Sequence, residues 1–346
     1  MNRKLTSLPA FFLLALLPFS GCETTTAGDS SGGAGSGNKR GGKGNGGITR
    51  NTTATTRANP GKDIPIIDTH IHLYDTARKG GVPWPPATDK VLYRPVLTGD
   101  YDKVAEENNI AATVVVEASD LVEDNQWVLD LTKGNPKRYI AVVGNLPVGA
   151  EEFAGLVERF SKDPRFVGIR LRQRPAGNFF NDNTWRDLEL LAEKGLVLDV
   201  LLADFNLAEV SLIAKRVPKL KILANHLTGL TITPLSPENS WAEEVVKLAA
   251  NPNVYCKISG IFQRSGQIPA PKDLGYYEKV FKVVYDAFGE DRVIYGSNWP
   301  VTDRGGEYHE QLSIIHSYFE NKGKRVMEKL YYKNAEAFYG ISLSAN

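Results

Sequence analysis

Eight short apolar runs, rich in β-branched residues, alternate with longer amphipathic stretches along residues 63–346. Strands that alternate with helices pair in parallel, in a sheet that the helices cover. Eight repeats fit one (β/α)8 TIM barrel, which typically takes about 250 residues plus insertions. An open doubly wound sheet is the alternative, but no Gly-rich fingerprint follows the first run. The expected strands span residues 64–74, 111–118, 139–145, 166–172, 196–202, 220–226, 254–259 and 292–297.

The helices that this α/β pattern predicts lie between the strands, and two extra ones follow the last strand. Pro residues precede several strands, where a helix must end. The expected helices span residues 101–108, 123–134, 151–163, 184–194, 207–216, 240–250, 274–288, 307–321 and 323–339.

Composition excludes several classes of protein. The chain has 346 residues, of which 42% are hydrophobic and 23% charged, enough apolar material for a large core. No apolar run approaches the roughly 20 residues of a spanning helix, which excludes a polytopic membrane protein. A balance of 41 basic against 40 acidic residues argues against a dedicated nucleic-acid-binding protein. Two cysteines cannot form a disulfide-dense scaffold.

The N-terminus has the features of an export signal. Arg3 and Lys4 precede a short apolar segment, residues 9–19, and small residues then precede Cys22. This order is similar to a bacterial lipobox, in which the cysteine receives lipid and the signal is cleaved before it. A plain secretory signal is the alternative. We therefore expect residues 1–21 to be a lipoprotein-type signal peptide and the protein to be exported and anchored by Cys22 to a membrane of the bacterial envelope, in the periplasm or at the outer membrane.

Residues 22–62 are dominated by Gly, Ser, Thr and Asn. Such a segment has too few large apolar side chains to offset the entropy of ordering itself, which predicts a disordered tether. The domain therefore spans residues 63–346.

Histidines lie at the ends of two of the expected strands. In a barrel of this kind, chemistry takes place at the C-terminal ends of the strands. His70 and His72 alternate along the end of the first strand, so both side chains point to one side and can share a metal ion. His226 ends the sixth strand, and Asn298 follows the eighth. We expect these three histidines to converge at the mouth of the barrel.

Charged residues mark other strands. Glu117 ends the second strand, and Arg170 and Arg172 lie on one face of the fourth. Asp199 and Lys257 lie within the fifth and seventh strands, where they either contribute to a site or form an ion pair in the barrel lumen.

Four other residues give weaker indications of a functional role. Trp84 lies in the loop after the first strand, where it either covers a substrate or anchors the loop. Cys256 lies within a strand and is expected to be a small buried hydrophobic residue. His309 and His316 fall in an expected helix, away from the strand ends.

Five stretches carry a resemblance to a known family: IDTHIHLYD (67–75), GIRLRQ (168–173), NPNVYCKISG (251–260), DRVIYGSNWPV (291–301) and NAEAFYGI (334–341). They resemble the amidohydrolase superfamily, in its amidohydrolase-related branch, and within it lactonases of the L-fuconolactonase and sulfomuconolactone hydrolase type. The resemblance implies a distorted (β/α)8 barrel and hydrolysis of an ester-like bond in a small sugar- or muconate-derived lactone.

The sequence departs from the family at Asn298, where the family usually has Asp. In related enzymes that Asp ligates metal or accepts the proton of the attacking water. A side-chain amide has no basic electron pair, so Asn298 cannot be a general base. Asn225 also stands where the look-alikes tend to have Asp, and no metal-bridging lysine is evident on the fourth strand.

These matches predict a catalytic set of His226, Asn298 and Glu117. If one divalent metal binds, zinc or manganese, His70 and His72 would hold it, with Asn298 or Glu117 completing the site and the ion acidifying water. Without a metal, His226 is the best base, since an imidazole has an ordinary pKa near 6.5.

Arg170, Trp84 and Trp299 are the expected substrate-binding residues, with Arg170 orienting a carboxylate or polarising the carbonyl. The expected partner is a small carboxylate or lactone. Two alternatives remain open: a metal-dependent decarboxylase of the same branch, and a catalytically weakened, surface-tethered barrel that binds a carbohydrate or another small molecule.

Overall fold

The computed structural model describes residues 62–172, 179–202 and 205–343. The expected signal peptide, Cys22 and the tether up to residue 61 lie outside the described residues. Residues 56–346 form one compact unit.

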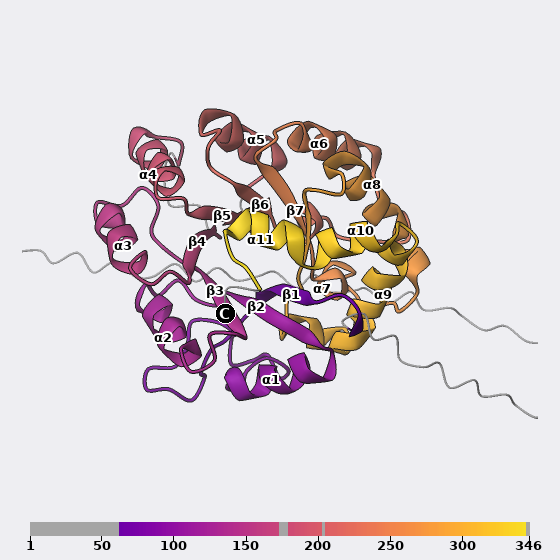
Figure 1. The fold of residues 1–346 in the computed structure, drawn as a ribbon, viewed down its shortest axis with the longest axis horizontal. Helices are drawn as coiled ribbons and strands as arrows, with labels where there is room; N and C mark the ends of the chain where they lie inside the picture. Colours follow the sequence, from indigo (N-terminus) through magenta and orange to yellow (C-terminus); the bar gives the residue numbers. More distant parts are fainter. Residues whose placement is uncertain (1–61, 173–178, 203–204, 344–346) are drawn as a thin grey trace, which may run out of the picture. The chain divides into compact units, whose positions relative to one another are not determined.

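Eight parallel strands form a single sheet in the order of the chain, with a helix after each strand (Figure 1). Every expected strand is present, so the predicted α/β architecture, a (β/α)8 TIM barrel, is confirmed. The strands are β1 (Ile66–Ile71), β2 (Ile110–Val116), β3 (Tyr139–Gly144), β4 (Phe166–Leu171), β5 (Val197–Val200), β6 (Ile222–Ala224), β7 (Val254–Ile258) and β8 (Val293–Tyr295).

Most helices lie where the amphipathic stretches predict them. Two of them start at a side-chain cap: Asn181 Oδ1 accepts from the Thr184 N–H, and Asn206 Oδ1 from the Glu209 N–H. The helices that follow β1 to β7 are α1 (Thr98–Glu107), α2 (Glu123–Thr132), α3 (Phe153–Phe160), α4 (Asp182–Glu193), α5 (Leu207–Arg216), α6 (Asn239–Ala249), α7 (Ile261–Arg264) and α8 (Glu278–Phe288).

The predicted 274–288 helix is divided, because Asp273 accepts from the Gly275 N–H and starts a separate 3₁₀ turn, η3 (Leu274–Tyr276), ahead of α8. The predicted 323–339 helix is also divided, by a π-helical turn. The elements that follow β8 are η4 (Val301–Arg304), α9 (Tyr308–Glu320), α10 (Lys324–Glu328), η5 (Lys329–Lys333) and α11 (Asn334–Tyr339).

The ring of strands closes through the segment that follows β8. The His72 N–H donates to the Trp299 carbonyl (2.9 Å), and the Asn298 N–H donates to the His70 carbonyl (2.8 Å). An isolated parallel bridge joins Ile71 to Trp299. This closure brings the residues after β8 beside the end of β1, where the histidine pair lies.

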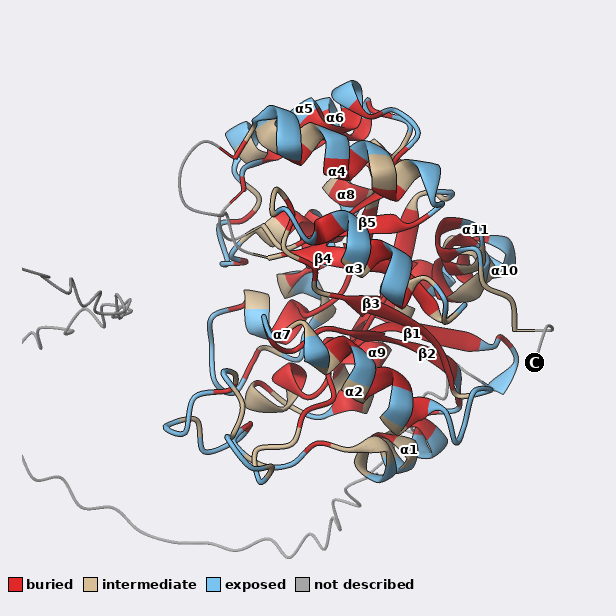
Figure 2. Cartoon of the chain, turned by 90° about the vertical axis from the view of Figure 1, so that its left-hand side faces the viewer, coloured by how far each residue is buried: buried red, intermediate tan, exposed pale blue. Residues whose placement is uncertain are grey.

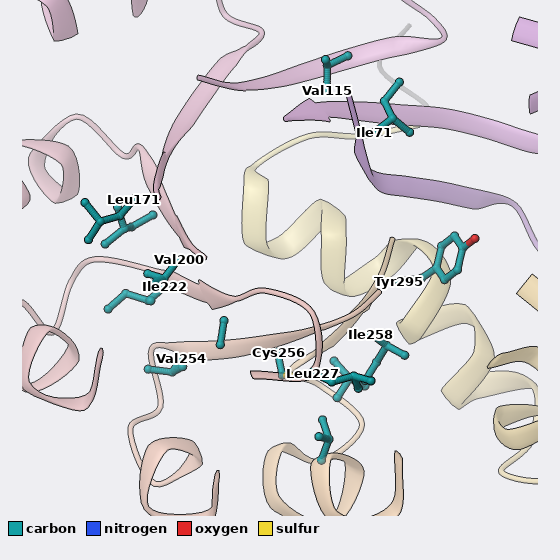
Figure 3. Close-up of a cluster of buried hydrophobic side chains, with 14 of the residues drawn as sticks. Ile71, Val115, Leu171, Val200, Ile222, Leu227, Val254, Cys256, Ile258 and Tyr295 are labelled. Atoms are coloured by element: carbon teal, nitrogen blue, oxygen red, sulfur yellow. The ribbon is translucent and has the colours of Figure 1, made fainter. Parts of the chain in front are cut away.

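Side chains of the strands alternate between two layers. Both layers are buried, and the strands are therefore mostly red in Figure 2. One layer faces the surrounding helices and includes Ile71, Val115, Leu171, Val200 and Ile258 (Figure 3). The other fills the lumen. Since burial of each such side chain contributes about 1.5–3 kcal/mol, the two layers hold the strand ends in place.

The extra C-terminal helix, α11, lies across the ring of strands (Figure 1) and closes the lumen. Phe338 and Tyr339 belong to the same buried cluster as lumen residues such as Val197 and Leu223. Lys221, just before β6, donates to the Ala337 carbonyl, which places α11 at the N-terminal ends of the strands. The helix leaves the opposite end of the barrel open, where the C-terminal ends of the strands can form a site.

Among the described residues, none of the helices is both long enough and apolar enough to cross a membrane.

Candidate active site

A cavity of about 130 Å³ lies where β1, β4, β6 and β8 end. Its lining combines imidazole, guanidinium and amide groups with a few apolar side chains. Among the described residues, no aspartate or glutamate lines it. The lining residues are His72, Trp84, Ala118, Arg170, Arg172, Leu201, His226, Gln263, Asn298, Val301 and Arg304.

The three histidines converge, as the strand pattern predicts. The ring of His70 lies 5.0 Å from that of His72 and 4.6 Å from that of His226, between ring centres. All three are almost fully buried. His309 and His316 lie on α9, outside this cluster.

Asp68 fixes the end of β1 from within the core. Its Oδ1 accepts the backbone N–H groups of His70 (3.1 Å) and Ser297 (2.8 Å). Its Oδ2 accepts the hydroxyls of Tyr101 (3.0 Å) and Tyr308 (2.9 Å). Four donors on one buried carboxylate hold the first strand against the eighth, and burial raises the pKa of Asp68.

Lys257 and Asp199 form the lumen ion pair that was one of the two predicted alternatives, at 2.7 Å and with no exposed side-chain surface. The ammonium also donates to the Thr69 carbonyl (3.0 Å) and lies 3.3 Å from His70 Nδ1. Tyr339 of α11 donates to Asp199 Oδ1 at 3.3 Å. The pair therefore connects the closed end of the lumen to the histidines.

Glu117 binds two arginines. Arg170 donates from Nε to Glu117 Oε1 (2.5 Å) and from Nη2 to the Glu117 carbonyl (3.1 Å), and Arg172 Nη1 donates to Oε2 (3.3 Å). Burial raises the pKa of the Glu117 carboxyl, against the opposing effect of the two guanidinium groups. Glu117 does not reach the cavity, so the expected role in completing a metal site is corrected: its carboxylate positions the two arginines.

His72 lies between two backbone carbonyls and the Asn298 amide. Its Nδ1 is 3.1 Å from the oxygens of both Val116 and Glu117, and its Nε2 is 3.2 Å from Asn298 Oδ1, while Asn298 Nδ2 donates to Gln263 Oε1 (2.8 Å). Burial lowers the pKa of His72 to about 3, so the ring is neutral and has a single N–H. A half-turn of both amides makes the contacts of His72 consistent: Nδ1–H donates to the carbonyls, and Asn298 Nδ2 donates to His72 Nε2.

His226 lies where the chain leaves β6 in a left-handed turn. His226, Leu227 and Thr228 have φ angles of 53°, 52° and 57°. Three consecutive non-glycine residues in this region are costly, a kind of strain that concentrates at functional sites. The turn aims His226 into the cavity, with Nδ1 2.9 Å from Ser259 Oγ. Burial, reinforced by Arg170 and Arg264, lowers the pKa of His226 well below 6.5, so it is neutral at pH 7.

The donor set does not fit a divalent metal. Within the described residues, no three His, Cys, Asp or Glu side chains are grouped as metal ligands are. Asn298 provides a neutral amide where the family usually has a carboxylate. Arg170 Nη1 lies 3.4 Å from His70 Nε2, so a guanidinium cation stands at one of the two nitrogens that would ligate the ion.

The two tryptophans have different positions. Trp84 lines the cavity with its ring 5.5 Å from that of His72, so its role in substrate binding stays a prediction. Trp299 does not line it: its ring lies 5.3 Å from that of Tyr101, and the Arg94 guanidinium lies 5.9 Å from the centre of the Trp299 ring. The expectation that Trp299 binds substrate in this cavity is therefore corrected.

Sequence reasoning missed two polar lining residues. Gln263 lies on α7, a helix of four residues, and Arg304 lies on η4, where it pairs with Asp89 through Nε (3.0 Å). The one feature of the sequence that could have indicated them is their position, since each residue follows shortly after a strand that ends at the mouth. Cys256 is buried, as expected, and burial raises the pKa of its thiol.

Comparison with known proteins agrees with this geometry. L-fucono-1,5-lactonase of Burkholderia ambifaria is 30% identical over 70% of this chain and 82% of its own length. The crystal structure of an amidohydrolase from Burkholderia multivorans with bound zinc matches with a TM-score of 0.71 and 24% identity, over 80% of this chain and all of that one. A 5-carboxyvanillate decarboxylase from Novosphingobium aromaticivorans, complexed with manganese, has a TM-score of 0.59 and 15% identity, over 80% of this chain and 96% of that one.

The lactonase match covers most of both chains, whereas the two structural matches show the fold alone. The amidohydrolase family profile matches residues 67–341, which include all eight strands apart from Ile66, the first residue of β1, and the whole cavity lining. The chain is therefore a hydrolase that belongs to the amidohydrolase family.

Proposed function

We propose that this protein hydrolyses a small lactone that carries a carboxylate or another acidic group. The observation that carries the proposal is the pairing of a neutral, buried His226 with Arg170 in one cavity, which offers a base and an anion-stabilising group together. The similarity to lactonases over most of the chain supports the same reaction class.

The proposed reaction needs one water and no group from outside the chain. Water attacks the lactone carbonyl while His226 Nε2 accepts its proton, which requires the His226 Nδ1–H to donate to Ser259 Oγ. The carbonyl oxygen becomes an oxyanion beside Arg170. When the tetrahedral intermediate collapses, the ring C–O bond breaks and the leaving alkoxide takes the proton from His226. The product is a hydroxy acid.

The charge of the lining supports an acidic substrate. Arg170, Arg172 and Arg304 line the cavity, and none of the described lining residues is acidic. Glu117 and Asp89 balance part of this charge from behind the arginines. Guanidinium groups bind carboxylates through paired hydrogen bonds, so an acidic substituent on the lactone gives it a fixed orientation.

A panel of lactones with a proton-release readout, run on residues 56–346 with and without a chelator, tests the proposal. We expect lactones that carry a carboxylate to be opened faster than neutral aldonolactones, at a rate that the chelator leaves unchanged. Release of CO2 from aromatic acids would favour the decarboxylase, and binding without turnover would favour the carbohydrate-binding barrel.

His226→Gln separates catalysis from binding. Loss of a general base lowers kcat by roughly 10²- to 10⁴-fold. His316→Gln is the matched control, because His316 lies on α9 beside Glu320 and away from the cavity. Equal activity of the His226 variant and the wild type would contradict the proposed role.

A further inference from the structure

Basic residues gather in four consecutive loops at the closed end of the barrel. The loops lead from α2 to β3, α3 to β4, α4 to β5 and α5 to β6, so they lie side by side at the N-terminal ends of neighbouring strands. They hold eight basic residues and one acidic residue, Asp163. The eight basic residues form what we call the basic rim: Lys133, Lys137, Arg138, Lys162, Arg165, Lys194, Lys219 and Lys221.

Most of the charge of the basic rim has no carboxylate partner. All six of its lysines are exposed, and within the described residues Lys194 alone among them forms an ion pair, with Glu158. The two arginines are half-buried, each within 3.9 Å of an aspartate. Residues 62–346 as a whole carry 34 basic and 38 acidic residues. The rim is therefore a local excess of positive charge on an acidic domain.

Helix dipoles alone do not account for the basic rim. The C-terminus of a helix favours basic residues, and each of the four loops follows one. The loops that precede β2, β7 and β8 also follow helix C-termini. Yet residues 108–109 and 250–253 contain no basic residue, and residues 289–292 contain two acidic residues and one basic. The basic residues therefore mark one side of the barrel end, and not helix ends in general.

The chain enters the barrel at the same end. Lys62, the first described residue, lies four residues before β1, so the segment before it joins the domain at the face that carries the basic rim. The sequence of that segment predicts a lipid-anchored export signal. Among the described residues, the exposed large apolar side chains all lie outside the four loops. A face with many ammonium groups and no apolar side chain to insert fits the headgroups of anionic phospholipids.

We propose that the basic rim docks on the anionic phospholipid surface of a membrane and turns the mouth of the barrel away from it. The cavity lies at the opposite ends of the strands, so it stays open to solvent while the rim is in contact. Each basic residue close to an anionic bilayer strengthens binding by about fivefold, and salt screens this effect. The contact is therefore reversible: it orients an anchored protein and does not replace an anchor. It does not depend on lactone hydrolysis.

Co-sedimentation of residues 56–346, the compact unit, with lipid vesicles tests the docking. At low ionic strength we expect binding to vesicles of phosphatidylglycerol and phosphatidylcholine in equal parts, and none to phosphatidylcholine alone. Binding should be lost at about 1 M salt, where the Debye length is about 3 Å. Removal of four exposed rim lysines should weaken binding at least about 100-fold, in the variant Lys133→Gln/Lys137→Gln/Lys162→Gln/Lys219→Gln.

The matched control removes the same charge from exposed lysines outside the basic rim, in the variant Lys79→Gln/Lys90→Gln/Lys103→Gln/Lys279→Gln. It should bind nearly as well as the wild type. Equal weakening of the two variants would assign binding to net charge and overturn the proposal. A wild type that does not bind the anionic vesicles, or that binds a double-stranded oligonucleotide more tightly, would overturn it as well.

A fluorescent label at one introduced cysteine tests the orientation. Cys256 is buried, so an environment-sensitive fluorophore reacts at the new thiol of Gly134→Cys, in the loop before β3, or of Thr88→Cys, in the loop after β1. Both positions are exposed. Anionic vesicles should shift the emission of the label at position 134 and leave that of the label at position 88 unchanged. Any other combination would overturn the proposed orientation.

Discussion

At the scale of single residues, the site depends on imidazoles that are kept neutral. His226 is buried against Arg170 and Arg264, so its protonated form is unfavourable and its pKa is lowered well below 6.5. A base acts in its unprotonated form, and a lower pKa moves the acid limb of the rate profile to lower pH. We therefore expect kcat/KM for lactone opening to stay constant as the pH falls from 7.5 to about 6.5, the ordinary imidazole pKa, and to decline only well below it.

A pH–rate profile measured with a substrate that carries no group titrating in this range checks the expectation. Arg264→Gln removes one of the charges that lower the pKa of His226, so its acid limb should move toward higher pH. An acid limb at or above pH 6.5 in the wild type would contradict the assignment of a buried, neutral base.

The sequence predicts which histidines meet because strand periodicity and the end of a strand are both local properties. His70 and His72 share a side since strand side chains alternate. The contacts of the two rings are not local: His70 Nδ1 lies 3.3 Å from Lys257, 187 residues away, and His72 Nδ1 lies 3.1 Å from the Val116 carbonyl, 44 residues away. Pairings of this kind follow from the closed ring and cannot be read from spacing.

At the scale of elements, the turn from β7 into α7 brings two site residues into place. Gly260 has a φ of +60°, and a Cβ at this position would lie 3.0 Å from His226 Nδ1 and 3.2 Å from the side-chain amide of Asn298. Gly266 has a similar φ of +64°, but a Cβ there would meet nothing within 4 Å in the described chain. Alanine variants at the two glycines therefore distinguish two effects. Backbone strain is common to both positions, whereas contact of the added methyl group with the site occurs only at Gly260.

We expect Gly260→Ala and Gly266→Ala to lower the free energy of unfolding by a similar amount, about 1–2 kcal/mol, because both place a side chain in the left-handed region. Only Gly260→Ala should also displace His226, and lower kcat/KM by about 10- to 100-fold. Urea denaturation and initial-rate measurements on both variants check this. Equal activities of the two would show that His226 tolerates the added methyl group.

The elements themselves differ in how well sequence predicts them. Strand β3 is a continuous apolar run that follows Pro136, and α5 matches its predicted span of 207–216. The four residues of α7 make hardly more than one helical turn, too few for a 3.6-residue period to be visible, so the helix that carries Gln263 was missed. The division of residues 323–339 was missed because its π-helical turn, η5, keeps an amphipathic pattern.

At the scale of the whole molecule, buried polar contacts run through the lumen from one end of the barrel to the other. Tyr339 on α11 donates to Asp199, which pairs with Lys257, which in turn contacts His70 at the mouth. These contacts therefore connect α11, at the N-terminal ends of the strands, to the site at their C-terminal ends. The C-terminal segment NAEAFYGI, far from the catalytic face, supplies the Tyr339 hydroxyl to this series of contacts.

The lipid attachment expected at Cys22 can be tested separately from the activity, because residues 56–346 form a compact unit of their own. If Cys22 carries lipid, the wild type should incorporate labelled palmitate and sediment with membranes. Cys22→Ser should incorporate none and appear in the soluble exported fraction, with the specific activity of the domain unchanged. Cys256→Ala is the matched control, since it alters the other of the two cysteines, which is buried in β7. A wild type that is exported without lipid would show that residues 1–21 are a plain secretory signal, because cleavage and export need no modified cysteine.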